Sequence, residues 1–202
     1  TSAPTTVFDA NIFYPERGTL AYSEANLGAG LLAAPVYWMT GSAYAAHNFA
    51  LLCSFVLSAT ATYYLVRHLT GYRPAAIVSA ICFAWAPHVV AHMLHIQLLM
   101  TAGIPLSLLA FHRLSDRPTP GRGAALGAAM AIQVLLCAYY AVFTVLVIGF
   151  AVIFTAAFRR WWLNRQYWSS LAAGAVVAAV MAAPVIGPYI SLARLSGPLR
   201  PL

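Results

Sequence analysis

The sequence predicts an all-α protein, a polytopic bundle of transmembrane helices with about six membrane crossings, and three observations carry this prediction. Of the 202 residues, 62% are hydrophobic and 7% are charged, a composition that would expose too much apolar surface in water. Long apolar runs alternate with short polar segments. All eleven basic residues are Arg and cluster in those segments, which is typical of membrane loops and not of a nucleic-acid-binding surface.

Residues 1–42 are expected to form a loop with a short interfacial helix. Their apolar run, residues 28–38, is interrupted by Pro35. A membrane span needs about 20 apolar residues, whereas a run of about 10 to 14 more often lies in the interface or re-enters. Tyr37 and Trp38 are of the residue types that gather at headgroup depth. The helix is therefore expected at the membrane surface.

Residues 43–192 are expected to form the helix bundle. Residues 124–158 would make a single helix about 50 Å long at about 1.5 Å per residue, against a hydrocarbon core of about 30 Å. This stretch is therefore expected to fold back near residues 137–140. The last span is expected to kink near Pro184 or Pro188. In chain order the apolar runs are residues 43–66, 74–90, 96–111, 124–158 and 171–192.

The distribution of charge predicts the topology. The loops at residues 67–73, 113–122 and 159–165 hold eight of the eleven Arg residues and one acid, Asp116. Cytoplasmic loops carry the Arg excess, so an even number of crossings should separate successive basic loops, and residues 1–42 should lie on the outer side. An outer N-terminal loop normally follows a preceding span. The chain is therefore expected to be a portion of a longer protein.

Three of the four acidic residues, Asp9, Glu16 and Glu24, fall in the predicted outer loop. A carboxylate at the outer mouth of a helix bundle can act as a general base toward a hydroxyl, or can hold a divalent cation. The alternative is a solvated loop that is acidic because it is not cytoplasmic. Glu16 adjoins Arg17 and is more simply explained as a surface pair.

His88, His92 and His95 form the second candidate group. Their offsets of four and three residues place all three imidazoles on one face of a continuous helix. Such a stripe could bind a lipid phosphate, ligate a metal together with one of the acids, or form hydrogen bonds at the interface without chemistry. Alternatively, the helix could break at Pro87 and turn near His95.

Polar residues inside the spans form a third group, because buried polar groups in lipid are costly and usually face the interior of the bundle. Their simplest role is hydrogen bonding between helices. Arg194 and Arg200, which follow the last span, could clamp a phosphate or could be ordinary flanking charges. The intramembrane polar residues are His47, Asn48, Gln97, Gln133, Tyr139 and Tyr140.

Three stretches resemble the GT-C superfamily of polytopic membrane glycosyltransferases, in particular bacterial proteins related to the protein mannosyltransferase and aminoarabinose transferase branch. They are the D-x-x-x-F-Y-P pattern from Asp9, the span that ends in residues 64–71 as Tyr-Leu-Val-Arg-His-Leu-Thr-Gly, and residues 83–88 as Phe-Ala-Trp-Ala-Pro-His. The resemblance implies transfer of a sugar from a polyprenyl-phosphate donor to an acceptor on the outer face of the cytoplasmic membrane.

The resemblance also implies roles for individual residues. The catalytic base maps onto Asp9, with Glu24 as a second candidate. The departing lipid phosphate would be stabilised by His92, His95 or Arg200. Many members of the superfamily carry two adjacent acidic residues at the position where this chain has Asp9 followed by Ala10. The resemblance therefore does not imply a bound divalent cation, although such a cofactor is possible.

A transporter or flippase-like protein that moves a lipid-linked substrate without bond chemistry is the alternative function. Prolines that interrupt paired short spans, as Pro87 and Pro105 do, also suit a transporter. Asp9 discriminates between the two classes, because a transferase depends on it. A transporter would depend most on intramembrane polar residues such as His47 and Gln133.

Overall fold

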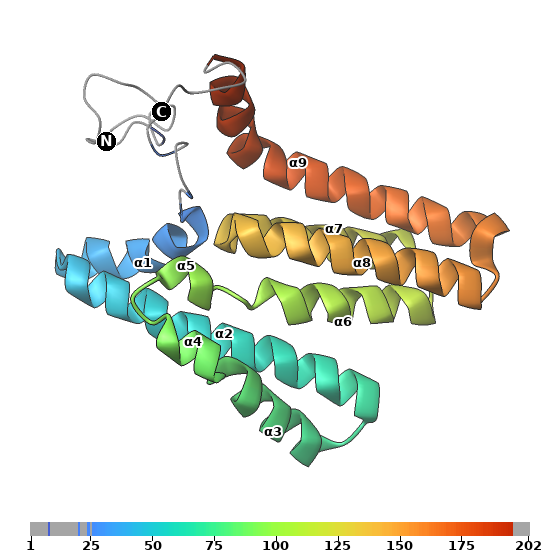
Figure 1. The fold of residues 1–202 in the computed structure, drawn as a ribbon, viewed down its shortest axis with the longest axis horizontal. Coiled ribbons are helices and arrows are strands. Elements are labelled where there is room, and N and C mark those ends of the chain that lie inside the picture. Colours follow the sequence, from blue (N-terminus) through green and yellow to red (C-terminus); the bar gives the residue numbers. More distant parts are fainter. Residues whose placement is uncertain (1–7, 9–19, 21–23, 25, 196–202) are drawn as a thin grey trace.

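Figure 1 shows the computed structural model of the chain, which describes residues 8, 20, 24 and 26–195, with side chains up to residue 190. Every regular element of this described part is a helix, so the predicted all-α class is confirmed. In chain order the helices are α1 (Leu27–Thr40), α2 (Ala43–Thr70), α3 (Arg73–Ala84), α4 (Pro87–Ala91), α5 (Ile96–Leu99), α6 (Gly103–Asp116), α7 (Pro120–Leu136), α8 (Ala138–Phe158), a short 3-10 helix η3 (Trp161–Leu163) and α9 (Arg165–Leu195).

Five segments of the described chain are long and apolar enough to cross a membrane, namely α2, α3 with α4, α5 with α6, α8, and α9 up to Ile190. The chain is therefore a multi-pass membrane protein. Helix α7 has 17 residues, about 25 Å at about 1.5 Å per residue, and lies alongside α6, α8 and α9 (Figure 1). The sixth predicted crossing rests on α7 and stays a prediction.

The boundaries of the helices follow local signals. The predicted helix of the N-terminal region is present as α1, which continues through Pro35 and ends at Gly41 with φ 66°. Helix α2 starts at Ser42, whose hydroxyl accepts a hydrogen bond from the Ala45 N–H at 3.3 Å, and ends at Gly71 with φ 67°. These are a side-chain N-cap and two left-handed C-caps. Because α2 is terminated by Gly71 and not where the apolar residues end, it is four residues longer than the apolar run of residues 43–66.

The predicted fold-back is confirmed. Helix α7 ends at Leu136, Cys137 alone has an extended backbone with φ −161° and ψ 115°, and α8 begins at Ala138. The two helices run side by side in opposite directions (Figure 1). Helix α9 contains Pro184 and Pro188 and changes direction toward its C-terminal end (Figure 1), as expected for a proline kink.

The three arginine-rich loops lie at one end of the bundle, on the right in Figure 1. Arg159, at the end of α8, donates a hydrogen bond to the Ser115 carbonyl of α6 at 2.9 Å. The His68 imidazole, at the end of α2, lies 3.1 Å from the Asp116 carboxylate at the end of α6. These contacts confirm that the loops share one end, as the charge pattern predicts.

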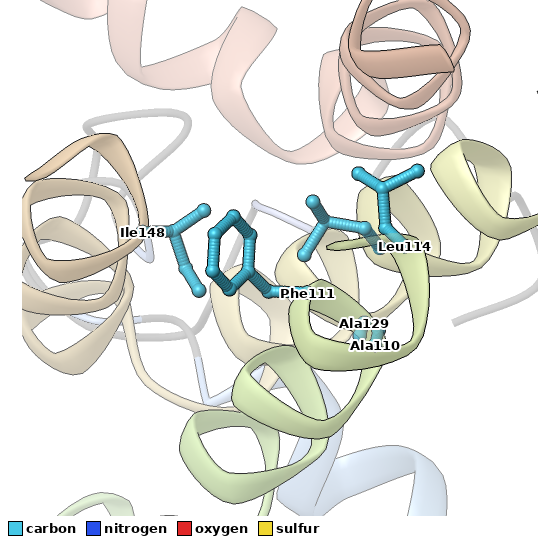
Figure 2. Close-up of a cluster of buried hydrophobic side chains, with 6 residues drawn as sticks. Ala110, Phe111, Leu114, Ala129 and Ile148 are labelled. Carbon is cyan, nitrogen blue, oxygen red and sulfur yellow. The ribbon is translucent and has the colours of Figure 1, made fainter. Parts of the chain in front are cut away.

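The main core lies between α6, α7 and α8. Figure 2 shows Phe111 and Ile148 pointing toward one another, with Ala110, Leu114 and Ala129 close by. Leu126 completes the buried cluster. The outer face of α8 is different, because Phe150, Phe154 and Phe158 are stacked along it and remain exposed. A row of exposed aromatic side chains on a membrane helix is a lipid-facing surface.

Glycines bring α7 and α9 into backbone contact. A Cβ atom added at Gly174 of α9 would lie 2.5 Å from the Gly123 carbonyl oxygen of α7, and one added at Gly127 would collide with the backbone of Gly174. Gly123 and Gly127 form a G-x-x-x-G pair, the spacing that allows close helix approach in lipid. Gly174 of α9 therefore packs directly against a glycine face of α7.

Candidate functional site

The candidate site lies at the end of the bundle opposite the arginine loops. The corner between α4 and α5, the start of α1 and the N-terminus of α8 meet there (Figure 1). Two clusters of polar groups occupy this end, one around Glu24 and one around His88 and His92. The first turn of α8 lies between them and contributes to both.

Glu24 caps the N-terminus of α8. Its Oε1 atom accepts hydrogen bonds from the backbone N–H groups of Ala138 and Tyr139, the latter at 3.3 Å. Helix α8 has no cap from its own N-cap residue, Cys137. A carboxylate satisfies these donors and interacts favourably with the helix dipole. The geometry therefore gives Glu24 a structural role, and its predicted role as a second catalytic base stays a prediction.

Cys137 belongs to the Glu24 cluster. Its Sγ atom lies 3.8 Å from Glu24 Oε2 and donates to it. Burial raises the pKa of the Cys137 thiol to about 11, and the neighbouring Glu24 carboxylate adds to this shift. The thiol is therefore protonated at neutral pH, consistent with a hydrogen-bond donor and not with a nucleophile.

A cavity of about 160 Å³ adjoins Glu24. Asn26 and Tyr189 also line it, together with apolar residues of α7 and α9. The Asn26 Oδ1 atom is buried without a hydrogen-bond partner among the described residues. No histidine lines this cavity, so Glu24 and the histidines do not face one common pocket.

The three histidines are close together but do not lie on one continuous helix. Helix α4 holds His88 and ends at Ala91, His92 follows it as its C-cap, and His95 directly precedes α5, which begins at Ile96. The ring centroids of His88 and His92 are 4.3 Å apart, and those of His92 and His95 are 6.2 Å apart. The structure thus has the broken helix with a turn near His95 and not the continuous stripe, and the turn keeps the rings adjacent.

Hydrogen bonds define the orientation of two of the imidazoles. His92 Nδ1 lies 2.8 Å from the His88 carbonyl oxygen, and because a carbonyl only accepts, Nδ1 carries the proton and Nε2 is left for another partner. The Tyr140 hydroxyl donates to the Leu98 carbonyl at 3.2 Å. His88 Nε2, 3.4 Å from the same hydroxyl, is then the donor toward Tyr140.

The two tyrosines of the candidate set have different positions. Tyr140 connects α8 to the α4–α5 corner through its hydroxyl. Tyr139 is 64% exposed, and only its backbone N–H contacts the Glu24 cluster. Consecutive residues of a helix point about 100° apart, so only Tyr140 can join the histidines.

The other candidates are only partly described. Asp9 and Arg200 lie outside the described residues, and Arg194 lies in the last turns of α9 with its side chain outside the described part. Phe8, which precedes Asp9 in the sequence, packs its ring edge-on against Tyr189 at a centroid distance of 6.0 Å. Among the described side chains no group of three or more His, Cys, Asp and Glu residues is arranged to hold a metal ion.

Gln133 is a further polar residue of this end. It is fully buried, and its amide donates to the Met100 carbonyl at 3.1 Å and to the Cys137 carbonyl at 3.4 Å. These bonds join the segment before α6 to the hinge between α7 and α8. The simplest expectation for an intramembrane glutamine, hydrogen bonding between helices, matches this geometry.

The cap that Glu24 provides was missed by the sequence reasoning, because a residue 114 positions before Ala138 supplies it. One signal exists in the sequence: α8 starts after Cys137, which is a poor N-cap residue.

Comparisons with protein-family models, curated proteins and solved structures give no match for this chain.

Proposed function

We propose that this chain is part of a membrane glycosyltransferase that moves a sugar from a polyprenyl-phosphate-linked donor to an acceptor on the outer face of the cytoplasmic membrane. The observation that supports the proposal is the cluster of His88, His92, His95 and Tyr140 at the end opposite the arginine loops. By the positive-inside rule this end is the outer one. A lipid phosphate in the outer leaflet lies at that depth.

The histidine cluster is proposed to contact the phosphate of the donor. His88 and His95 are exposed and His92 is half-buried, so their ring nitrogens can be reached from outside the bundle. Imidazole N–H groups are good donors toward phosphate oxygens. During transfer the bond between the anomeric carbon and the phosphate oxygen breaks, and that oxygen keeps the electron pair. Donors that face it lower the barrier for this step.

The acceptor hydroxyl must lose its proton as its oxygen bonds to the anomeric carbon. Asp9 is proposed to take this proton, as the resemblance to GT-C enzymes implies. Glu24 is proposed to act indirectly, since it holds the first turn of α8 and with it Tyr140. Arg194 and Arg200 are proposed as additional phosphate contacts from the region that follows the last span.

The proposal can be tested in membrane vesicles that contain the protein and a polyprenyl-phosphate donor with a radiolabelled sugar, with release of polyprenyl phosphate as the readout. Replacement of Asp9 by Asn should lower the rate roughly 100-fold to 10,000-fold if Asp9 is the general base. The double change His88→Ala and His92→Ala should lower it roughly 100-fold if these rings face the phosphate.

His68→Ala is the matched control, because it removes an imidazole at the opposite end of the bundle, where His68 pairs with the half-exposed Asp116. Its rate should stay near that of the unchanged protein. If Asp9→Asn keeps full transfer activity, the proposed mechanism is wrong. Loss of lipid movement at His47 and Gln133 variants, without any transfer reaction, would support the transporter alternative instead.

A further inference from the structure

A long apolar groove runs between the helices on one side of the bundle, away from the histidine cluster. Its first part is a hollow of about 400 Å³ between α1, α2, α6 and α7. Its lining residues are almost all aliphatic. They include Leu31, Leu57, Leu106, Leu109, Ile132 and Leu135.

A second hollow of about 560 Å³ continues along the seam between α6 and α7. It shares Leu106, Leu109 and Ile132 with the first hollow, so the two adjoin. Ala125 and Ala128 have short side chains and leave this part open. From Gly121 to Leu136 the combined groove follows α7 for about 22 Å, at about 1.5 Å per residue.

The far end of the groove is basic. Arg113 and Arg122 line the second hollow, and none of the described residues that line either part is acidic. Arg122 Nη1 donates to the carbonyl oxygens of Arg113 and Arg117, at 2.5 and 3.4 Å, which fixes the guanidinium at the wall and leaves its other N–H groups available. Asp116 at the same end of α6 is engaged by His68. The N-terminus of α7, which begins at Pro120, adds a positive helix end.

We infer that this groove binds an anionic phospholipid, with an acyl chain along the α6–α7 seam and the phosphodiester at Arg113 and Arg122. An aliphatic channel that ends in two guanidinium groups matches an amphiphile with an apolar tail and a phosphate head. Basic pockets between transmembrane helices bind anionic lipid headgroups in this way. A zwitterionic lipid such as phosphatidylcholine has the same phosphodiester but also a quaternary ammonium, which the guanidinium groups of Arg113 and Arg122 would repel, and a free phosphate would leave the groove empty.

The inference does not depend on the proposed transferase function. The arginine end of the groove lies at the opposite end of the bundle from the histidine cluster (Figure 1). The lipid would belong to the leaflet next to the arginine loops and would cover the opening between α2, α6 and α7. It would therefore be a bound structural lipid and not a substrate.

Native mass spectrometry of the protein released from a nonionic detergent can test the inference. Phosphatidylglycerol, phosphatidylcholine with the same acyl chains, and inorganic phosphate would be added separately. One phosphatidylglycerol should stay bound at concentrations at which phosphatidylcholine does not, and inorganic phosphate should neither bind nor displace it. The double change Arg113→Gln and Arg122→Gln should weaken phosphatidylglycerol binding roughly 30-fold.

The matched control is the double change Arg73→Gln and Arg165→Gln, which removes two charges from the same end of the bundle outside the groove. It should bind phosphatidylglycerol as the unchanged protein does. Ala125→Phe provides a second, charge-independent test, because Ala125 is exposed in the groove and a phenyl ring there would occupy the path of the acyl chain. Ala175→Phe, on the exposed face of α9, is its control.

The outcomes separate clearly. Equal affinity for phosphatidylglycerol and phosphatidylcholine, or unchanged binding by the Arg113 and Arg122 double variant, would overturn the inference. Displacement of the lipid by inorganic phosphate would also overturn it, since the arginines would then be a simple anion site. If the double variant does not fold, Ala125→Phe decides: weaker phosphatidylglycerol binding than in Ala175→Phe supports the groove, and equal binding refutes it.

Discussion

Replacement of Glu24 separates a structural role of this carboxylate from a catalytic one. Glu24→Ala removes the acceptor of two backbone N–H groups at the start of α8, and no side chain of α8 itself replaces it. Loss of an N-cap costs about 0.5–2 kcal/mol, and loss of a negative charge at a helix N-terminus costs about 0.3–1 kcal/mol when exposed and up to about 2 kcal/mol when partly buried.

Glu24 is half-buried, so the upper part of these ranges applies, and Glu24→Ala should lower the free energy of unfolding by about 2–3 kcal/mol. Glu24→Gln keeps one acceptor oxygen for the two backbone N–H groups but loses the charge and the acceptor of the Cys137 thiol, so its cost should be about 1 kcal/mol. For a chain of this size, about 1 kcal/mol corresponds to a shift of roughly 2–4 °C in the melting temperature.

The assay is thermal unfolding in detergent, combined with hydrogen exchange of the backbone amides of residues 138–141. Both Glu24 variants should melt at lower temperature, and exchange should increase in the first turn of α8 before it increases elsewhere. Asp116→Asn is the control, because it also removes one negative charge, from an exposed pair with His68 that contributes little to stability.

Two results would refute the capping role. The first is an unchanged melting temperature with unchanged exchange at residues 138–141 in Glu24→Ala. The second is a Glu24→Gln variant that loses sugar transfer completely while its stability matches that of the unchanged protein. The second result would restore Glu24 as a catalytic base.

Three further predictions concern single contacts. Tyr140→Phe should lower the free energy of unfolding by about 1 kcal/mol, because it leaves the half-buried Leu98 carbonyl without its donor. Tyr139→Phe is the control, because that side chain is exposed, and it should change the melting temperature by less than about 1 °C. Equal effects of the two substitutions would contradict the geometry. Gly174→Ala must push α7 away, because its Cβ would lie 2.5 Å from Gly123 O, whereas ordinary contact begins at 3.4 Å. The substitution should lower the free energy of unfolding by about 1–3 kcal/mol. Gly149→Ala is the control, because nothing lies within 4 Å of its Cβ, and it should be neutral or slightly stabilising in thermal unfolding.

The remaining prediction concerns Gln133. Gln133→Leu should cost about 1–3 kcal/mol, because the buried Met100 carbonyl loses its donor, whereas the Cys137 carbonyl keeps the hydrogen bond from the Ala141 N–H at 3.0 Å. Thermal unfolding in detergent measures the loss. A variant that melts like the unchanged protein would show that water or another group satisfies the Met100 carbonyl.

Much of the fold could be predicted because hydropathy and Arg placement report on the membrane directly. The fold-back at Cys137 followed from length alone, since residues 124–158 cannot form one span. The clustering of His88, His92 and His95 was also expected, although for an incomplete reason. The helix breaks before Pro87, yet α4 continues for one turn, which is enough to bring His92 back to the His88 carbonyl.

The contacts of the candidate site could not be predicted because they join distant segments. Glu24 meets Ala138, and Tyr140 meets Leu98, and no local pattern encodes either pair. In a soluble helix the polar face would show which of Tyr139 and Tyr140 points inward. In α8 the lipid-facing and protein-facing sides are both apolar, so the sequence carries no such signal, and tertiary contact alone selects Tyr140.

Helix α7 packs among other helices although it is too short to count as a membrane span by itself. It contacts α1, α6, α8 and α9, and its buried positions are mostly small or polar: Gly123, Gly127, Ala129, Ala131 and Gln133. Where α7 meets its neighbours it does not need large apolar side chains, and its glycines let α9 approach closely, whereas its face toward the groove stays open at Ala125. With 17 residues, α7 is shorter than the about 20 that a membrane span needs, which is why it is absent from the five spanning segments although it contacts four other helices.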